Sequence, residues 1–322
     1  MNFHLRHIAL AVGATLPITG AFAAENYPTK PIRMIVGFAP GGGTDSTARP
    51  IAAKMAEMMG QQVIVDNRPG AAGNIATELV IGANPDGHTI LMGTIAALAI
   101  NPSLYKNLPF DPEKGLAPVV HVVDSTNILS LNPGVQASSV KELIALAKVK
   151  SLSSGSSGVG GTGHMAMELF NVMAGTKLVH VPYKGGGPAM IALVAGEVQI
   201  VFATAASAIP QIKANRIRGI AVTTTKRSSL LPDMPSISEA GLSGFDANNW
   251  YGIVVPVKTP RAIVNRLNAD VNKILALPEI KTLLFNQGLD VAGGTPEQFA
   301  AYMKSERVKW AKVIKESGAK PE

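Results

Sequence analysis

Cysteine is absent from the 322-residue chain, so disulfide bridges, thiolate nucleophiles and cysteine-bound metals are excluded. Charged side chains make up only 16% of the residues, and the 29 lysines and arginines are spread along the chain without a basic block. The formal net charge of +7 therefore predicts a diffusely basic surface and no nucleic-acid partner. A hydrophobic content of 47% over this length is enough for a large core and predicts two domains.

Long apolar runs are also lacking, apart from one at the N-terminus. Residues 1–7 carry an arginine and no acid, residues 8–22 are apolar and small, and Ala21-Phe22-Ala23 has the small-x-small pattern of a cleavage site. This run of about 15 residues, interrupted by Pro17, is too short to span a bilayer. We therefore predict a signal peptide over residues 1–23, cleaved after Ala23, and a soluble mature protein in the periplasm.

Short apolar runs, each followed by a loop and a segment of helical spacing, recur along the chain and are typical of βα units. The predicted strands are 32–38, 63–65, 89–92, 119–123, 128–131, 178–181, 198–202, 217–223 and 251–255. The predicted helices include 51–58, 76–80, 140–149, 164–173, 188–196, 261–276, 279–287 and 297–316. No internal repeat of fixed period is present.

The units form two series, which predict an α/β protein with a two-lobed fold like that of periplasmic binding proteins. Each lobe is expected to be a mainly parallel sheet flanked by helices, with the ligand cleft between the lobes. We place lobe 1 at residues 24–122 plus 250–322 and lobe 2 at residues 123–249. Such sheets bind ligands at the carboxyl ends of their strands, where the loops gather.

The first of these loops, Phe38 to Asp45, contains three consecutive glycines between a strand and a helix. Backbone N–H groups at the positive end of a helix favour an anion, and either Thr44 or Asp45 can cap the helix. A plain tight turn is the alternative interpretation of this loop alone. The next loop, Pro69 to Asn74, repeats the pattern, and the convergence of two such loops strengthens the anion hypothesis. Arg68 can reach the cleft or lie on the surface.

A third loop, Ser153 to His164, contains glycines in the spacing G-x-G-x-x-G. A dinucleotide site is not expected, because no acidic residue follows at the required distance and the chain is exported. The chain has no H-E-x-x-H, G-x-S-x-G or phosphate-loop motif, so neither a cofactor nor a metal site is predicted. His164, at the first turn of a helix, is interpreted as structural or ligand-adjacent rather than as a general base.

With these residues laid out, the chain resembles the Bug family of periplasmic proteins, the substrate receptors of tripartite tricarboxylate transporters. The resemblance spans the mature chain. The matching pieces are Tyr27-Pro28 with Lys30 to Arg33, Phe38 to Asp45, Val65 to Ala71, Asn101-Pro102 with Leu104-Tyr105 and Leu108 to Asp111, Ser153 to Gly155 with Gly161 to His164, Val181 to Gly185, Leu231 to Pro235, Trp250 to Gly252, and Thr295 to Glu297.

The resemblance implies a receptor, not an enzyme, that captures a small organic carboxylate and delivers it to membrane transporter subunits; we expect a monomer. It implies that loop amides and bridging waters hold the carboxylate. Carried over residue by residue, the expected ligand-binding residues are Phe38, Ala39, Gly42, Gly43, Thr44, Asp45, Gly70, Ala71, Ala72, Ser154, Gly161 and Thr162. An exported hydrolase and a binding-only sensor for a signalling system are the alternatives.

Two features depart from the family pattern. Relatives often have Asp after the phenylalanine that corresponds to Phe202, whereas this chain has Ala203 and Thr204, so an acceptor for a ligand amine is missing. The helix after the first loop contains Pro50, whose ring clashes with the preceding turn. That helix is therefore expected to begin later than the loop suggests, or to kink.

Overall fold

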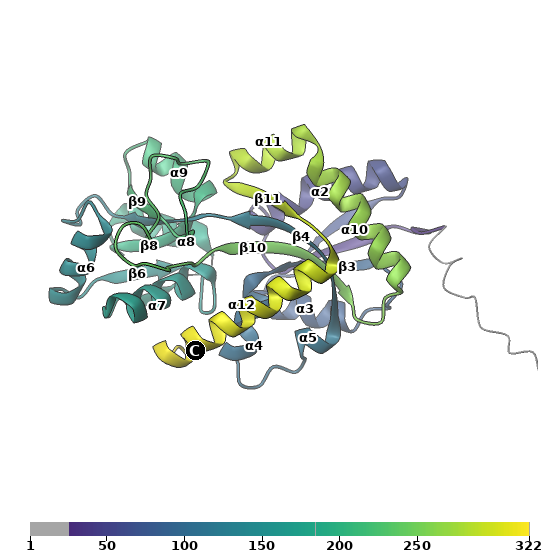
Figure 1. The fold of residues 1–322 in the computed structure, drawn as a ribbon, viewed down its shortest axis with the longest axis horizontal. Coiled ribbons are helices and arrows are strands. Elements are labelled where there is room, and N and C mark those ends of the chain that lie inside the picture. The colour runs from purple at the N-terminus through teal and green to yellow at the C-terminus, as the bar shows by residue number, and fades with distance from the viewer. Residues whose placement is uncertain (1–25, 184, 322) are drawn as a thin grey trace, which may run out of the picture.

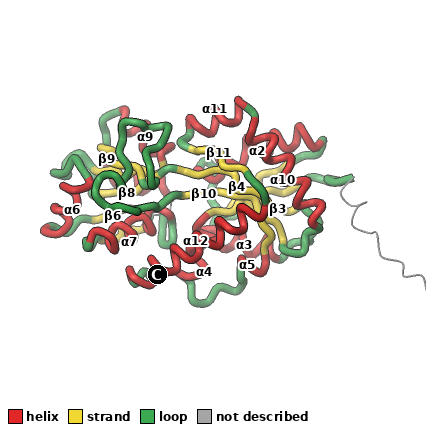
Figure 2. The backbone as a smooth tube through the Cα atoms, viewed as in Figure 1, coloured by secondary structure: helices red, strands yellow, loops and turns green. Residues whose placement is uncertain are grey.

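The structure is a computed structural model that describes residues 26–183 and 185–321. The predicted signal peptide and its cleavage site lie outside the described residues. The described chain forms a six-stranded sheet and a five-stranded sheet, each with its own helices (Figure 1), and Figure 2 shows the strands gathered in two groups. We call the part around the six-stranded sheet lobe 1 and the other part lobe 2.

Lobe 1 has the strand order β11-β4-β10-β3-β1-β2. Its strands are β1 (Ile32–Val36), β2 (Val63–Asn67), β3 (Thr89–Thr94), β4 (Leu116–Ser125), β10 (Asn249–Pro256) and β11 (Leu289–Gly293). Its helical segments are α2 (Gly43–Met59), η1 (Ala71–Gly73), α3 (Asn74–Ile81), η2 (Ala96–Ile100), α4 (Asn101–Leu104), α5 (Pro112–Gly115), α10 (Arg261–Ala276), α11 (Pro278–Asn286) and α12 (Pro296–Ser317).

Lobe 2 has the strand order β7-β6-β8-β5-β9. Its strands are β5 (Asn127–Leu131), β6 (Ser153–Ser156), β7 (Val179–Pro182), β8 (Ile200–Thr204) and β9 (Arg218–Val222). Its helices are α6 (Val140–Val149), α7 (Thr162–Ala174), α8 (Gly186–Ala195) and α9 (Ala205–Lys213).

Both sheets are mixed rather than mainly parallel. The parallel pairs are β1 with β2 and β3, and β6 with β7 and β8. The chain leaves lobe 1 along β4 and returns along β10, so these neighbouring strands run in opposite directions and pair antiparallel. The two crossings, at Ser125–Asn127 and before Asn249, lie side by side through the pairing of Asn249 with Ser125.

Apolar side chains fill both faces of each sheet. In lobe 1, α2, α10 and α11 cover one face, where Ile51, Met55 and Leu267 are fully buried. In lobe 2, α6 and α7 cover one face and α8 and α9 the other. The long helix α12 contacts η2 of lobe 1 and α7 of lobe 2, and its Lys309 bonds Asp246 at 3.1 Å. It therefore runs along both lobes (Figure 1).

Helix α2 begins at Gly43 and runs through Pro50, so the expectation of a later start is wrong. Proline at this position removes one backbone hydrogen bond and crowds the carbonyl of Ser46. Ala48, Ile51, Ala52 and Met55 are buried on the flanking turns, and this apolar burial offsets the local cost. The first turn of α2 therefore stays in place beside the first loop.

Candidate functional site

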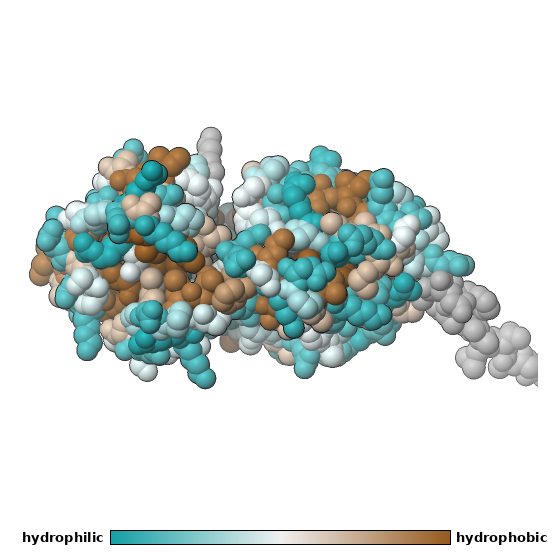
Figure 3. All heavy atoms as spheres, turned by 90° about the horizontal axis from the view of Figure 1, so that it is seen from above, coloured by the Kyte–Doolittle hydropathy of each residue, from teal (hydrophilic) through white to brown (hydrophobic). Residues whose placement is uncertain are grey.

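The three loops singled out in the sequence follow the carboxyl ends of β1, β2 and β6 and lead toward α2, α3 and α7. Because β1 and β2 are parallel neighbours, the first two loops lie at the same edge of the lobe 1 sheet. The third loop comes close to α4 of lobe 1: a Cβ atom on Gly160 would lie 2.9 Å from Asn101 Oδ1 and 2.9 Å from Leu104 Cδ2. Figure 3 shows the two lobes as separate masses with a hollow between them.

The carboxylate of Asp45 holds the first loop in shape. It accepts hydrogen bonds from Gly41 N at 2.9 Å, from Arg49 Nε and Nη2 at 2.8 Å each, and from Asn67 Nδ2 at 2.9 Å. Asn67 also donates to the carbonyl oxygen of Phe38 at 2.9 Å. Asp45 therefore faces its own loop, and the helix N-cap, Gly42, receives no side-chain cap from it or from Thr44.

The charges beside the first loop compensate one another, because Asp45 pairs with Arg49. Burial alone would raise the pKa of Asp45, but the hydrogen bonds from Arg49, Gly41 and Asn67 outweigh it and hold the pKa below its usual value. The carboxylate thus stays charged and cancels the charge of Arg49. The positive potential that remains comes from the N–H groups at the start of α2, which have no intrahelical acceptor.

Close packing beneath the first turn of α2 requires a glycine. A Cβ atom on Gly43 would lie 2.8 Å from the hydroxyl oxygen of Tyr251, on the crossing strand β10. Asn249 Nδ2 donates to the same hydroxyl at 3.0 Å, and burial raises the pKa of Tyr251. The first loop therefore rests on the strand that connects the two lobes.

The second loop has an unusual backbone. Ala71 and Ala72 have φ angles of 46° and 51°, between Gly70 and Gly73, whose φ angles are 144° and 94°. Left-handed conformations cost a residue with a Cβ about 1–3 kcal/mol and concentrate at binding loops. Asn101 fastens the loop, because its Nδ2 donates to Ala72 O at 3.3 Å and to Asn74 Oδ1 at 2.7 Å.

Arg68, beside the second loop, is engaged elsewhere. Its Nε lies 2.9 Å from Asp66 Oδ1, and about half of the side chain is exposed. Asp66 also accepts from Arg33, at 2.5 Å, and both arginines lower its pKa, Arg33 more strongly. This arrangement favours the interpretation of Arg68 as a surface residue.

The third loop leads into α7, which begins at Thr162, with Gly161 as an N-cap that has no side-chain hydrogen bond. Ser156, at the carboxyl end of β6, places its hydroxyl 3.1 Å from both the N and the O of Gly158. A Cβ atom on Gly161 would lie 2.7 Å from Ser157 Oγ and 3.0 Å from Gly158 O. The loop is therefore tightly folded, with a short polar side chain at its base.

Of the twelve predicted residues, eleven lie in the three loops or at helix starts, and one lies inside a strand. Those at loops or at helix starts are Phe38, Ala39, Gly42, Gly43, Thr44, Asp45, Gly70, Ala71, Ala72, Gly161 and Thr162. Ser154 instead lies inside β6, two residues before the strand end, with its hydroxyl buried and without a hydrogen-bond partner among the described residues. At the end of β8, Ala203 is buried, and the hydroxyl of Thr204 pairs with that of Ser207 at 3.0 Å.

Asn67, Asn101, Ser156 and Tyr251 were not among the predicted site residues. Asn101 and Tyr251 stand in family-like pieces, Asn101-Pro102 and Trp250 to Gly252, and that was the signal available in the sequence. The contacts that give them a role connect residues distant in sequence. Asn101 reaches back 27 residues to Asn74, and Asn67 reaches back 29 residues to Phe38.

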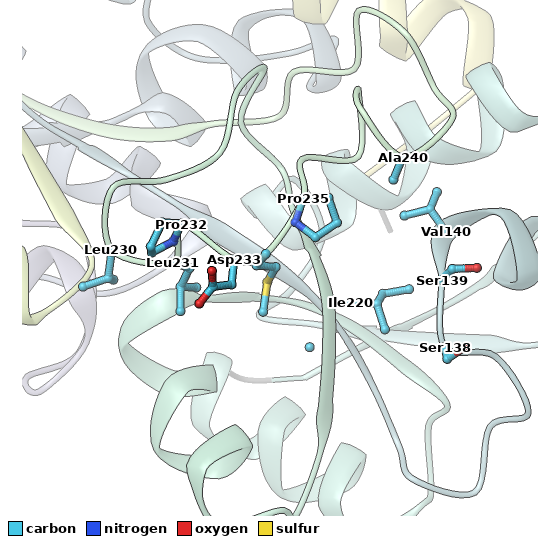
Figure 4. A pocket seen from close by; sticks show the side chains of 12 residues that line it. Ser138, Ser139, Val140, Ile220, Leu230, Leu231, Pro232, Asp233, Pro235 and Ala240 are labelled. Atoms are coloured by element: carbon cyan, nitrogen blue, oxygen red, sulfur yellow. The ribbon is translucent and has the colours of Figure 1, made fainter.

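A separate pocket of about 490 Å³ lies in lobe 2, away from the three loops (Figure 4). It is lined by residues 230–235, by the start of α6 and by Gly219 and Ile220 of β9, and it contains none of the predicted site residues. Over residues 26–183 and 185–321, no group of three or more histidine, aspartate or glutamate side chains could hold a metal ion. No helix in that part of the chain is long and apolar enough to cross a membrane.

Two sheets, each flanked by helices and joined by adjacent crossing strands, form the two-lobed fold of periplasmic binding proteins. The chain belongs to the tripartite tricarboxylate transporter family of receptors, whose family model matches residues 47–319. It is 38% identical over 310 residues to the "UPF0065 protein in tcbD-tcbE intergenic region" of Pseudomonas sp. strain P51, an alignment that covers 95% of this chain and 92% of the relative.

Solved structures give the same result. R. palustris Rpa4515 with adipate has a TM-score of 0.86 and 35% identity, covering 92% of this chain and 100% of that one. The periplasmic binding protein BugD has a TM-score of 0.83 and 32% identity, covering 92% of this chain and 100% of BugD. MatC from Rhodopseudomonas palustris with bound malate has a TM-score of 0.82 and 29% identity, with 89% and 100% covered. The predictions of the Bug family, of the two-lobed fold and of a receptor rather than an enzyme are confirmed.

Proposed function

We propose that this receptor captures a C4 to C6 dicarboxylate between its lobes and delivers it to the membrane subunits of a tripartite tricarboxylate transporter. One carboxylate would bind the amides of the first two loops, and the other would bind the start of α7. The observation that carries the proposal is the closeness of Gly160 in lobe 2 to Asn101 in lobe 1, where a Cβ on the glycine would lie 2.9 Å from Asn101 Oδ1, because it brings the third loop near the residue that fastens the second.

The electrostatics support a carboxylate rather than a larger polyanion. Arg49 and Arg68, the two arginines at the first two loops, are both paired with aspartates. The attraction then comes from helix starts and loop amides, which suit a carboxylate held by several N–H donors. Rpa4515 and MatC, with adipate and malate, supply examples of the size of ligand that a related cleft holds.

The end of β8 argues against an amino-acid ligand. Ala203 offers no acceptor there, and the hydroxyl of Thr204 pairs with Ser207. A ligand ammonium would lose its hydration without a compensating carboxylate, which is costly in a closed cleft. We therefore propose that the receptor selects a dicarboxylate without an amine.

Two lobes joined by adjacent crossing strands can close around such a ligand. We propose residues 24–122 plus 250–322 and residues 123–249 as the moving bodies, in a monomer exported to the periplasm with residues 1–23 removed. The last turns of α12 contact α7, so this contact must slide or open as the lobes move.

Calorimetric titration tests the function with malate, adipate, citrate, benzoate and aspartate. We expect malate or adipate to bind and to be recovered chemically intact after release. Aspartate should bind much more weakly than malate. Tight binding of aspartate with no binding of any amine-free dicarboxylate would contradict the proposal. The intact mass of the periplasmic protein checks the start at Ala24.

A further inference from the structure

Two stacked histidines lie beneath the third loop. The rings of His164, on α7, and His180, on β7, have centroids 3.9 Å apart and planes inclined by 16°. His164 Nδ1 accepts a hydrogen bond from Gly160 N at 3.1 Å, and its Nε2 lies 3.4 Å from Glu168 Oε1. The Nδ1 atom must therefore be unprotonated, and the ring proton sits on Nε2, facing the carboxylate.

The second ring supports the other end of the same loop. His180 Nε2 lies 2.6 Å from the hydroxyl oxygen of Ser156, which in turn contacts both backbone polar atoms of Gly158. The two imidazoles thus hold the loop at Ser156–Gly158 and at Gly160, the residue that meets lobe 1. His164 is 3% exposed, so water cannot replace its bond to Gly160 without local opening, whereas His180 is half-buried.

Protonation would disrupt this arrangement for geometric reasons. A proton on His164 Nδ1 would replace the acceptor with a donor that faces the N–H of Gly160. A further proton on His180 would place two positive rings in a stack. Burial, and secondly the neighbouring His164, lower the pKa of His180 from 6.5 to about 4.

Glu168 is the charged side chain that contacts the pair. The strands β6 and β8, which pack against α7, consist of Ser, Gly, Ile, Val, Phe, Ala and Thr residues and add no charge. The helix α12 also packs against α7. Several of its charges are paired elsewhere, Lys309 with Glu306 and Asp246, Arg307 with Glu113, and Lys312 with Glu316, while Lys304 and Lys315 are exposed. Among the described residues, the carboxylate of Glu168 is therefore the nearby negative charge that would offset positive charge on the two rings.

We propose that His164 and His180 are positioning residues, which keep the third loop in its binding shape only while both rings are uncharged. Acid should then weaken ligand binding through lobe 2 while the first two loops stay intact. The prediction for ligand affinity rests on the proposed function, whereas the effect on the loop itself does not.

The sign of the stability effect follows from the lowered pKa of His180. The unfolded chain binds a proton at this ring more readily than the folded chain does between about pH 6.5 and about pH 4. The stabilisation from the neutral ring is therefore complete above about pH 6.5 and is lost as the pH falls toward 4.

The test compares wild type with His164→Asn and His164→Phe by calorimetric titration of adipate from pH 8 to pH 4, which reaches the pKa of His180 at about 4. Asparagine Oδ1 keeps an acceptor for Gly160 N but cannot be protonated, whereas phenylalanine keeps the ring and removes the acceptor. We expect the wild type to lose about tenfold in affinity relative to His164→Asn as the pH falls, and His164→Phe to bind about tenfold more weakly throughout. Ionisation of adipate affects all three proteins equally and cancels in the ratio.

His88→Asn is the matched control, because His88 is a buried histidine at the amino end of β3 in lobe 1. This variant should keep the wild-type pH profile. Identical profiles for wild type and His164→Asn would overturn the proposal and leave the proposed function standing.

A measurement without ligand separates the proposed role of the histidines from the proposed function of the receptor. Hydrogen exchange at the Gly160 amide, followed by NMR with exchange rates corrected for pH, should show protection that falls with acid in wild type and not in His164→Asn. If adipate binds to none of the proteins, the choice of ligand fails, and this amide still decides the role of the histidines. Unchanged protection in wild type would refute that role.

Discussion

The first loop in lobe 1 and the third loop in lobe 2 are held by different chemistry. In lobe 1, a carboxylate, a guanidinium and an amide lock the first loop through Asp45, Arg49 and Asn67. In lobe 2, a hydroxyl and two stacked imidazoles support the third loop through Ser156, His180 and His164. Carboxylates and guanidinium groups keep their charges at the pH values where imidazoles titrate. We therefore expect the lobe 1 loops to keep their shape over the pH range in which the third loop of lobe 2 changes.

The largest expected effect comes from filling the third loop. Gly161→Val places side-chain carbon against Ser157 Oγ and Gly158 O, at 2.7 and 3.0 Å from the Cβ position. We expect a loss of affinity on the order of 100-fold for the dicarboxylate that the wild type binds best, measured by calorimetry. The φ angle of Gly161 is −66°, so the cause is steric crowding rather than backbone strain.

Gly82→Val is the matched control for this variant. Gly82 ends α3, away from the loops, and a Cβ atom there meets Glu78 O at an ordinary 3.6 Å. It should bind as wild type does. If Gly161→Val kept the wild-type affinity, the third loop would not be part of the binding site, and of the three loops only the two in lobe 1 would remain candidates.

A smaller effect is expected from unlocking the first loop with Asp45→Ala. The change removes an acceptor shared by Gly41, Arg49 and Asn67 and leaves the charge of Arg49 uncompensated. We expect affinity to fall about 10- to 100-fold and the free energy of unfolding to fall by about 2 kcal/mol, checked by calorimetry and urea denaturation.

Asp86→Ala provides the comparison for this second variant. Like Asp45, Asp86 accepts hydrogen bonds from a cationic side chain and from a backbone N–H group. The donors are Lys30 Nζ and His88 N, at the opposite end of the lobe 1 strands. It should alter stability without altering affinity. Equal losses of affinity in both variants would mean that general destabilisation, rather than loop shape, explains the result.

The smallest effect is expected from Arg68→Ala. The arginine pairs with Asp66 on an exposed surface, and such pairs contribute at most about 1 kcal/mol. We expect affinity to change by less than about fivefold, because the proposed contacts to the ligand are backbone amides, which we call the amide cradle. Complete loss of binding in Arg68→Ala, with binding retained in Gly161→Val, would replace the amide cradle with a guanidinium clamp.

Sequence periodicity was sufficient for most of the fold. The helices at 140–149 and 261–276 were predicted to the residue, because amphipathic spacing and caps are local signals. The sequence predicts a loop at Ser153–Ser156, because these residues have low strand propensity. They form the strand β6 only by pairing between β7 and β8. The strand β11 was missed in the same way, since it exists by pairing with β4.

The sequence by itself determined the family, the two series of βα units and the three glycine-rich loops, because these depend on residue order and on local backbone preference. Only the tertiary structure decided that Asp45 braces its own loop, that Asn101 ties the second loop, and that His164 stacks on His180. The physical reason is that side-chain hydrogen bonds and ring contacts act over a few ångströms. Their partners, such as Ser156 and His180, are 24 residues apart in the chain and meet only when the sheets form.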